Sequence, residues 1–178
     1  MCAIEYYTYE DYKLWEGDWE LIYGQPVAMA PSPVIMHQAI AFNIAKQIDI
    51  HKECENCLVV LEEDWIVEED TVLKPDVSLI CDEEGDFITK APEIVVEVVS
   101  KSTAKKDEKI KFEIYEKEKV KYYILAYPNH LKAKVYKLKD TKFDKVGDFT
   151  KEVLEIEDIR CPTKIDFYEV FKRFLQRR

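Results

Sequence analysis

The spacing of apolar residues along the chain predicts two main helices and a central strand. In residues 34–52, isoleucines recur every four positions, which predicts one long helix with an apolar face. The most β-branched run of the chain, residues 93–99, is typical of a buried central strand. A second helical pattern follows it over residues 103–119. A strand followed by a helix and another strand indicates a layered sheet protein.

Shorter apolar runs, separated by turns, predict the remaining elements. Strands are expected at residues 19–23, 27–30, 58–61, 65–67, 71–73, 76–81, 122–127, 132–138 and 153–156, and short helices at residues 9–16 and from Asp166 onward. Helices and strands are mixed along the chain, so we expect an α/β or α+β fold with a mixed sheet flanked by helices. No internal repeat or low-complexity linker interrupts the 178 residues, and we expect a single domain over residues 1–178.

Glu97 does not fit the role of a core residue. It lies in the middle of residues 94–99 and alternates onto the same face as Val95 and Val99. Ionised carboxylates are rarely buried without a partner or a metal, because desolvation costs several kcal/mol or raises the pKa. Asp76 begins another apolar strand upstream. Two carboxylates that converge from adjacent strands form an oxygen site suited to Mg²⁺ or Mn²⁺.

The predicted helix after Glu97 offers a cation to this site. Asp107, Lys111 and Tyr115 are spaced four residues apart and therefore share one helical face. An Asp four residues before a Lys also favours an ion pair between Asp107 and Lys111. If this helix packs back across the sheet, Lys111 reaches the site that holds Asp76 and Glu97.

The charge of the chain limits what it can bind. The formal net charge is -10, which argues against a surface that coats polyanions indiscriminately. Residues 101–121, however, contain eight lysines and five acidic residues, a local excess of +3. The basic segment therefore adjoins the predicted metal site, which is the arrangement that cleavage of a phosphodiester would require.

The cysteines and the apolar runs indicate a cytoplasmic protein. Five cysteines are an odd number without the density of a secreted disulfide scaffold, so we expect buried thiols in a reducing compartment. Cys54 and Cys57 form one C-x-x-C pair, but only His51 is nearby and no second pair follows, which disfavours zinc. No run approaches the roughly 18 apolar residues of a membrane span, and residues 1–16 lack the pattern of a signal peptide.

Several motifs follow one another in order over nearly the whole chain, from Tyr7 to Leu175. They are residues 20–24 (ELIYG), residues 31–33 (PSP) with His37, residues 74–76 (KPD), residues 92–103 (PEIVVEVVSKST), then Asp107, Lys111 and Tyr115, and residues 122–125 (YYIL). This ordered series resembles the Uma family of restriction endonucleases, which belongs to the PD-(D/E)XK phosphodiesterase superfamily.

The resemblance implies a restriction-endonuclease-like core, with a central mixed β-sheet flanked by helices. It also implies a metal site formed by Asp76, Glu97 and the backbone carbonyl of Val98. In the simple superfamily pattern a lysine stands two residues after the glutamate, where this chain has Val99. The resemblance implies that this lysine has moved to the helix as Lys111.

We therefore expect an endonuclease that uses Mg²⁺ or Mn²⁺ to hydrolyse phosphodiester bonds in DNA. Asp76 and Glu97 would hold the ion, and Lys111 would orient water or stabilise charge in the transition state. The alternative is a catalytically inactive module of the same fold that binds nucleic acid or protein. Cleavage of both DNA strands calls for two sites, so a homodimer is expected on symmetry grounds.

Four further residues are expected at or near this site. Glu20 lies in the middle of a predicted strand and would be an additional acidic ligand or its partner. His37, near the start of the long helix, would contact phosphate or support a ligand. Asp107 and Tyr115 are expected to pair with Lys111 and to pack its helix.

Overall fold

The computed structural model describes residues 5–29 and 34–176. Its centre is a six-stranded sheet with the order β10 (Lys142–Phe149), β9 (Lys132–Lys139), β8 (Tyr122–Tyr127), β7 (Ile94–Val98), β6 (Val77–Cys81) and β3 (Cys57–Leu61). β7 and β8 are parallel and the other neighbours are antiparallel, so the sheet is mixed, as predicted. The expected central strand is β7. The PSP motif and Cys2 lie outside the described residues.

Smaller elements surround this sheet. A four-stranded sheet has the order β2 (Gln25–Ala28), β1 (Trp19–Ile22), β5 (Thr71–Leu73) and β4 (Trp65–Glu68), and β11 (Val153–Ile156) pairs with β12 (Thr163–Asp166). The helices are α1 (Tyr9–Tyr12), α2 (Ile35–His51), the π-helical η1 (Lys106–Lys111), α3 (Phe112–Lys117), the 3-10 turn η2 (Pro128–His130) and α4 (Phe167–Leu175). Within the described residues, no helix is both long and apolar enough to span a membrane.

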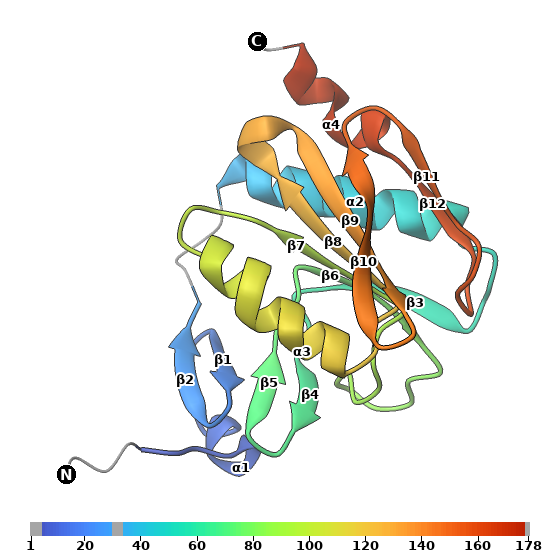
Figure 1. Ribbon diagram of the computed structural model, residues 1–178. Helices are drawn as coiled ribbons and strands as arrows, with labels where there is room; N and C mark the ends of the chain where they lie inside the picture. The colour runs from blue at the N-terminus through green and yellow to red at the C-terminus, as the bar shows by residue number, and fades with distance from the viewer. Residues whose placement is uncertain (1–4, 30–33, 177–178) are drawn as a thin grey trace.

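Two helical layers cover the six-stranded sheet, with α2 on one face and α3 on the other (Figure 1). On the α2 face, Val96 packs in one apolar core with Ile44. On the α3 face, Val95 belongs to a second core with Ile114. Because side chains alternate along a strand, Glu97 lies on the α3 face, as the sequence pattern predicts.

Some predicted elements were wrong or missing. The segment expected to be one α-helix over residues 103–119 is instead π-helical over η1 and α-helical over α3. The wider π turn instead directs Asp107 and Lys111 inward. β10 was not predicted because it is a largely exposed edge strand without apolar alternation. β12 was likewise taken for a loop.

The cysteines were also predicted wrongly. They are not isolated buried thiols, because the structure joins Cys54 to Cys161 and Cys57 to Cys81 as disulfides. Cys57 and Cys81 are directly opposite each other on β3 and β6, and Cys54 and Cys161 lie in loops 107 residues apart. Sequence spacing gives no sign of these pairs, because both depend on strands and loops meeting in the folded chain.

Candidate active site

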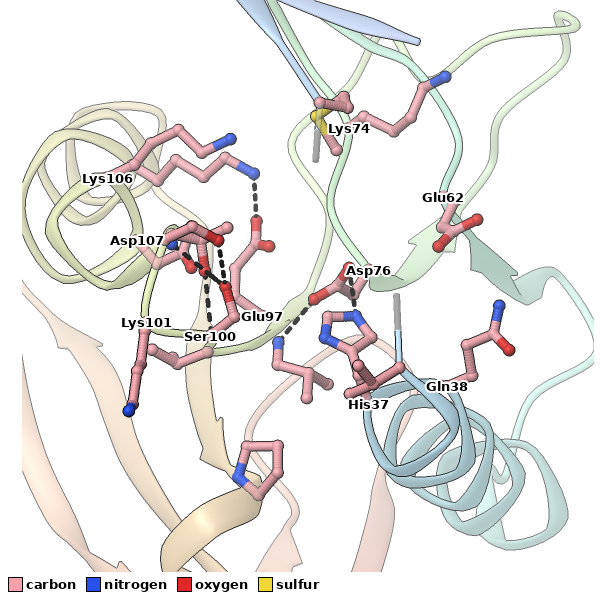
Figure 2. Close-up of a pocket in the computed structure, with 18 of the residues that line it drawn as sticks. His37, Gln38, Glu62, Lys74, Asp76, Glu97, Ser100, Lys101, Lys106 and Asp107 are labelled. Atoms are coloured by element: carbon pink, nitrogen blue, oxygen red, sulfur yellow. Dashed lines mark hydrogen bonds and ion pairs between the residues drawn. The ribbon is translucent and has the colours of Figure 1, made fainter. Parts of the chain in front are cut away.

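A pocket of about 580 Å³ lies where β6 begins and β7 ends. It is lined by most of the predicted site residues, namely His37, Asp76, Glu97, Val98, Asp107 and Lys111. Figure 2 shows Asp76 facing His37 on α2, with Glu97 and Asp107 on the opposite side of the pocket. The remaining two predicted residues, Glu20 and Tyr115, contact this group from behind. The structure therefore brings all eight residues together.

Asp76 is held between a strand and a helix. Its Oδ2 accepts a hydrogen bond from the Val98 backbone N–H at 2.6 Å, and its Oδ1 lies 3.2 Å from His37 Nε2. Burial opposes the charged form of His37, but the hydrogen bond and the negative charge of Asp76 outweigh it and raise the His37 pKa. Asp76 thus has a fixed orientation at the start of β6, with one side toward the pocket.

Glu97 is buried on the α3 face of β7. Its Oε1 accepts hydrogen bonds from Lys111 Nζ at 2.8 Å and from the Tyr115 hydroxyl at 2.7 Å. Burial raises the pKa of Glu97 well above its ordinary value, and the charges of Asp107 and Asp76 add to this, although Lys111 opposes it. The positive charge around Glu97 is therefore too small to compensate its desolvation.

Lys111 connects the two larger sheets. Its Nζ lies 2.6 Å from Glu20 Oε1 on β1 as well as 2.8 Å from Glu97 Oε1 on β7. Burial would lower the Lys111 pKa, but these two carboxylates raise it instead, so its ammonium stays charged. The predicted pair with Asp107 does not form among the described ion pairs, because Lys111 points to the two glutamates.

Glu20 receives most of the compensating positive charge. Besides Lys111, the Lys106 Nζ lies 2.5 Å from its Oε2, and the Lys74 backbone N–H donates to Oε1 at 3.0 Å. Burial opposes ionisation of Glu20, but Lys111 and Lys106 outweigh it and lower the Glu20 pKa. At neutral pH, Glu20 is thus ionised and paired with two lysines, Lys106 and Lys111. Glu97 has only Lys111, which it shares with Glu20.

Asp107 provides an independent sign that the pocket lacks positive charge. It is 2% exposed, and its Oδ1 is buried without a hydrogen-bond partner among the described residues. Burial raises its pKa, although Lys111 opposes this. Buried oxygen atoms are nearly always satisfied, so an unsatisfied one beside other acids favours an additional cation or donor.

These observations fit a divalent cation with oxygen ligands. Asp76, Glu97 and Asp107 face one pocket, in which Lys111 is the buried ammonium. Mg²⁺ commonly binds through one or two carboxylates and keeps several waters. Among the described residues, the acids do not place three oxygens within 4.8 Å of one another, so water would complete the coordination.

Two groups of site residues were not singled out by sequence reasoning. Lys106 pairs with Glu20, but in the sequence it is one of eight lysines in the same segment. Ser100, Lys101 and Ser102 form part of the pocket wall after β7. Their position directly after a strand that carries a buried glutamate is a signal that could have identified them.

Comparison with known proteins identifies the family of this chain. The Uma2 family, described as "Putative restriction endonuclease", matches residues 6–159. The chain belongs to the Uma2 family. This confirms the family expected from the ordered motifs. No curated protein matches this Uma2 chain.

A solved structure shares the fold of this Uma2 protein. The crystal structure of a "putative nuclease belonging to DUF820" from Anabaena variabilis ATCC 29413 matches with a TM-score of 0.70 and 14% sequence identity. The match covers 93% of this chain and 97% of the other. The mixed α+β fold around a central sheet is thus shared with a nuclease-like protein, as predicted.

Proposed function

We propose that this Uma2 protein is an endonuclease that hydrolyses phosphodiester bonds in DNA with Mg²⁺ or Mn²⁺ as cofactor. The observation that supports this most directly is the convergence of Asp76, Glu97 and Lys111 on one pocket. Asp76 directly precedes β6, Glu97 lies on β7 and Lys111 ends η1, so three separate segments of the chain contribute to the pocket. The buried carboxyls Glu97 and Asp107 share this pocket with one fully buried lysine, Lys111, and a divalent cation would give them a further partner.

In this proposal, Asp76 and Glu97 would hold the metal ion, and the Val98 carbonyl would be a third ligand. The ion would polarise the scissile phosphate and lower the pKa of a bound water. His37 and the Val98 N–H keep Asp76 oriented, and Tyr115 orients Glu97. These contacts would fix the two carboxylates before substrate binds, which reduces the cost of organising the site.

Lys111 would supply positive charge next to the reacting phosphate. Its ammonium stays protonated at neutral pH because Glu20 and Glu97 raise its pKa. It would donate a hydrogen bond to the attacking water or to a phosphate oxygen as negative charge increases in the transition state. At the pocket wall, Lys101 and Ser100 would bind neighbouring phosphates of the DNA backbone. A homodimer in the cytoplasm would place two such sites on opposite strands.

Plasmid cleavage tests this proposal. We expect the wild type to nick supercoiled DNA with Mg²⁺ or Mn²⁺ and to stop when EDTA is added. Asp76→Asn, Glu97→Gln and Lys111→Ala should each reduce the rate by about 100-fold or more, as losses of electrostatic catalytic groups do. The matched control Lys109→Ala changes an exposed lysine of the same helix and should retain activity. Equal rates for all of these proteins would contradict the proposal.

The second candidate is a non-catalytic binding module, which is favoured by one specific contact. Lys111 already binds Glu97 Oε1, one of the oxygens that a metal would need. In an inactive module this network would serve only to join the sheets. Titration with Mg²⁺ or Mn²⁺ separates the two functions. If the protein is a nuclease, the metal should raise its thermal stability, and this gain should be absent in Asp76→Asn. If it is a binding module, it should bind DNA as tightly in EDTA as with the metal.

A further inference from the structure

Four cysteines meet at the end of the six-stranded sheet away from the candidate active site. Cys81 ends β6, whereas Asp76 directly precedes the same strand. Five residues of extended chain separate them, or about 17 Å. None of the four cysteines lines the pocket that contains Asp76. Whatever these cysteines do is therefore separate from the proposed chemistry.

The cysteine cluster consists of Cys54, Cys57, Cys81 and Cys161. The sulfur atoms of Cys54, Cys57 and Cys161 lie within 4.8 Å of one another, and Cys81 is bonded to Cys57. The two disulfides of the cluster, Cys54–Cys161 and Cys57–Cys81, thus lie side by side. Four sulfur atoms around one Zn²⁺, each about 2.3 Å from it, are about 3.8 Å apart. Three of the sulfurs, those of Cys54, Cys57 and Cys161, thus already lie within reach of one ion, and reduction would free the Cys81 sulfur to turn toward them as the fourth ligand.

Backbone contacts hold the cluster together independently of its sulfurs. The Glu53 N–H donates to the Pro162 carbonyl at 3.0 Å, which joins the loop of Cys54 to that of Cys161. The Asp82 N–H donates to the Asn56 carbonyl at 3.1 Å, next to the pair Cys57 and Cys81 in the ladder of β3 and β6. Breaking the S–S bonds therefore leaves the four cysteines in place.

We propose that the reduced cluster, Cys54, Cys57, Cys81 and Cys161, is a tetrathiolate site for one structural Zn²⁺. Cys54 and Cys57 supply a C-x-x-C pair, and single cysteines from β6 and from the loop before β12 complete the four ligands that structural zinc requires. The sequence alone disfavours zinc because no second C-x-x-C pair follows Cys57, whereas the fold supplies the third and fourth sulfurs from the separate residues Cys81 and Cys161.

Burial distinguishes a zinc site from a reactive thiol centre. Cys161 is fully buried, and Cys57 and Cys81 are at least nine-tenths buried. Buried thiolates are costly unless a cation neutralises them, and reactive cysteines are usually partly exposed. In a reducing compartment, a set of cysteines at this spacing is more often a metal site than a pair of disulfides.

The two states interconvert by a balanced reaction. A dithiol reductant breaks each disulfide of the chain, transfers two electrons and two protons to it, and forms one disulfide of its own. Zn²⁺ then displaces the protons of the four thiols and forms four Zn–S bonds. The zinc form and the disulfide form contain the same four sulfurs joined in two ways.

The metal content of the reduced, full-length protein tests the proposal. The chain is purified in a thiol reductant, given Zn²⁺, and passed through a column with a weak chelator. We expect one Zn²⁺ per chain, and we expect Co²⁺ in its place to show thiolate charge-transfer absorbance and tetrahedral d–d bands. In the native zinc form, a thiol reagent should leave the four cluster cysteines unmodified.

Three variants locate the ion. Cys161→Ser should weaken Zn²⁺ binding by more than about 100-fold, because loss of a ligand exceeds the 10- to 100-fold effect of losing an outer contact. Cys2→Ser and Asp76→Asn should retain it. Zinc that is retained in Cys161→Ser and lost in Asp76→Asn would overturn the proposal. So would a reduced wild type with five reactive thiols, no zinc and no cobalt–thiolate absorbance, a result that does not depend on whether a variant folds.

Discussion

The two faces of strand β7 are built on different physical principles. Toward α2, Val96 packs among buried apolar side chains that include Ile44. Toward α3, Val95 is followed by Glu97, which is buried with Lys111 against it. One strand therefore has an apolar core on each side, and the core on the α3 side surrounds a buried ionic network. Packing on the α2 side holds β7 in a fixed position, and this fixed position keeps Glu97 in contact with Lys111 on the α3 side.

The difference decides how each face contributes to stability. Burial of apolar area is favourable at about 25 cal/mol per Å², and it requires no particular partner. A buried ion pair must overcome the desolvation of both charges, and it adds little net stability even though loss of one partner is costly. The α2 face should thus tolerate changes in pH, and the α3 face should not.

The largest expected effect comes from removing the cation of the α3 face. Lys111→Met leaves Glu97 and part of Glu20 buried without their ammonium, and should reduce the free energy of unfolding by about 3–5 kcal/mol. Urea denaturation measures this change. Lys109→Met, an exposed lysine of the same helix, should change it by no more than about 0.5 kcal/mol. Equal effects of the two substitutions would contradict the ionic description of this face.

A double variant sharpens this prediction. In Lys111→Met with Glu97→Leu, the uncompensated charge of Glu97 is gone, and Glu20 keeps its contact with Lys106 at 2.5 Å. Replacement of a buried pair by apolar residues is often neutral, so we expect the double variant to be more stable than Lys111→Met alone. If it is less stable, the cost of Lys111→Met arises from lost packing and not from buried charge.

On the α2 face, removal of one buried apolar side chain should reduce the free energy of unfolding by a smaller amount. Ile44→Ala removes a fully buried side chain and should cost about 3 kcal/mol, from lost transfer free energy and the cavity left behind. Ile50→Ala makes the same chemical change at a position of α2 that is 57% exposed, and should cost less than about 1 kcal/mol. The cost of Ile44→Ala should be equal at pH 5 and pH 8, which calorimetry or denaturation can check.

The contrast between the faces also explains what the sequence could predict. The isoleucine spacing of α2 and the β-branched run of β7 were enough to predict a helix and a buried strand, because apolar burial follows local periodicity in the sequence. Glu97 was recognisable because it interrupts that periodicity. The spacing of the following helix also placed Lys111 near Glu97, but it gave no sign that Lys111 pairs with Glu20 from a different sheet and not with Asp107. The order of the family motifs supplied the grouping that local patterns lacked.

The hydroxyl of Tyr115 should have a moderate effect. Tyr115→Phe removes the 2.7 Å hydrogen bond to Glu97 Oε1 and should cost about 1.5–2 kcal/mol, as expected for a bond to a charged or partly charged acceptor. Tyr168→Phe, on the exposed side of α4, is the matched control and should have almost no effect. A loss in both variants, or in neither, would mean that the Tyr115 hydroxyl does not hold Glu97.

The smallest effect concerns how stability depends on pH. The folded state raises the pKa of Glu97 above its ordinary value of 4.5, so it binds this proton more tightly than the unfolded chain does. Stability from Glu97 is therefore highest below pH 4.5 and declines as pH rises toward the folded pKa, by at most about 1.4 kcal/mol per pH unit. Glu97→Gln does not titrate, so the stability of the wild type relative to this variant should fall from pH 5 to pH 8.

Three other groups must be separated from this effect. Glu20 has a lowered pKa, so its stabilisation is present above pH 4.5 and is lost only as pH falls through its folded pKa, below the range measured. His37 and Asp107 have raised pKa values and also lose stabilisation as pH rises above their ordinary values of 6.5 and 3.8, but they are present in the wild type and in Glu97→Gln alike. Denaturation in EDTA at each pH therefore isolates Glu97. A difference between the two proteins that stays constant from pH 5 to pH 8 would show that Lys111 neutralises Glu97 completely, and the pocket would then have no deficit of positive charge for a metal to fill.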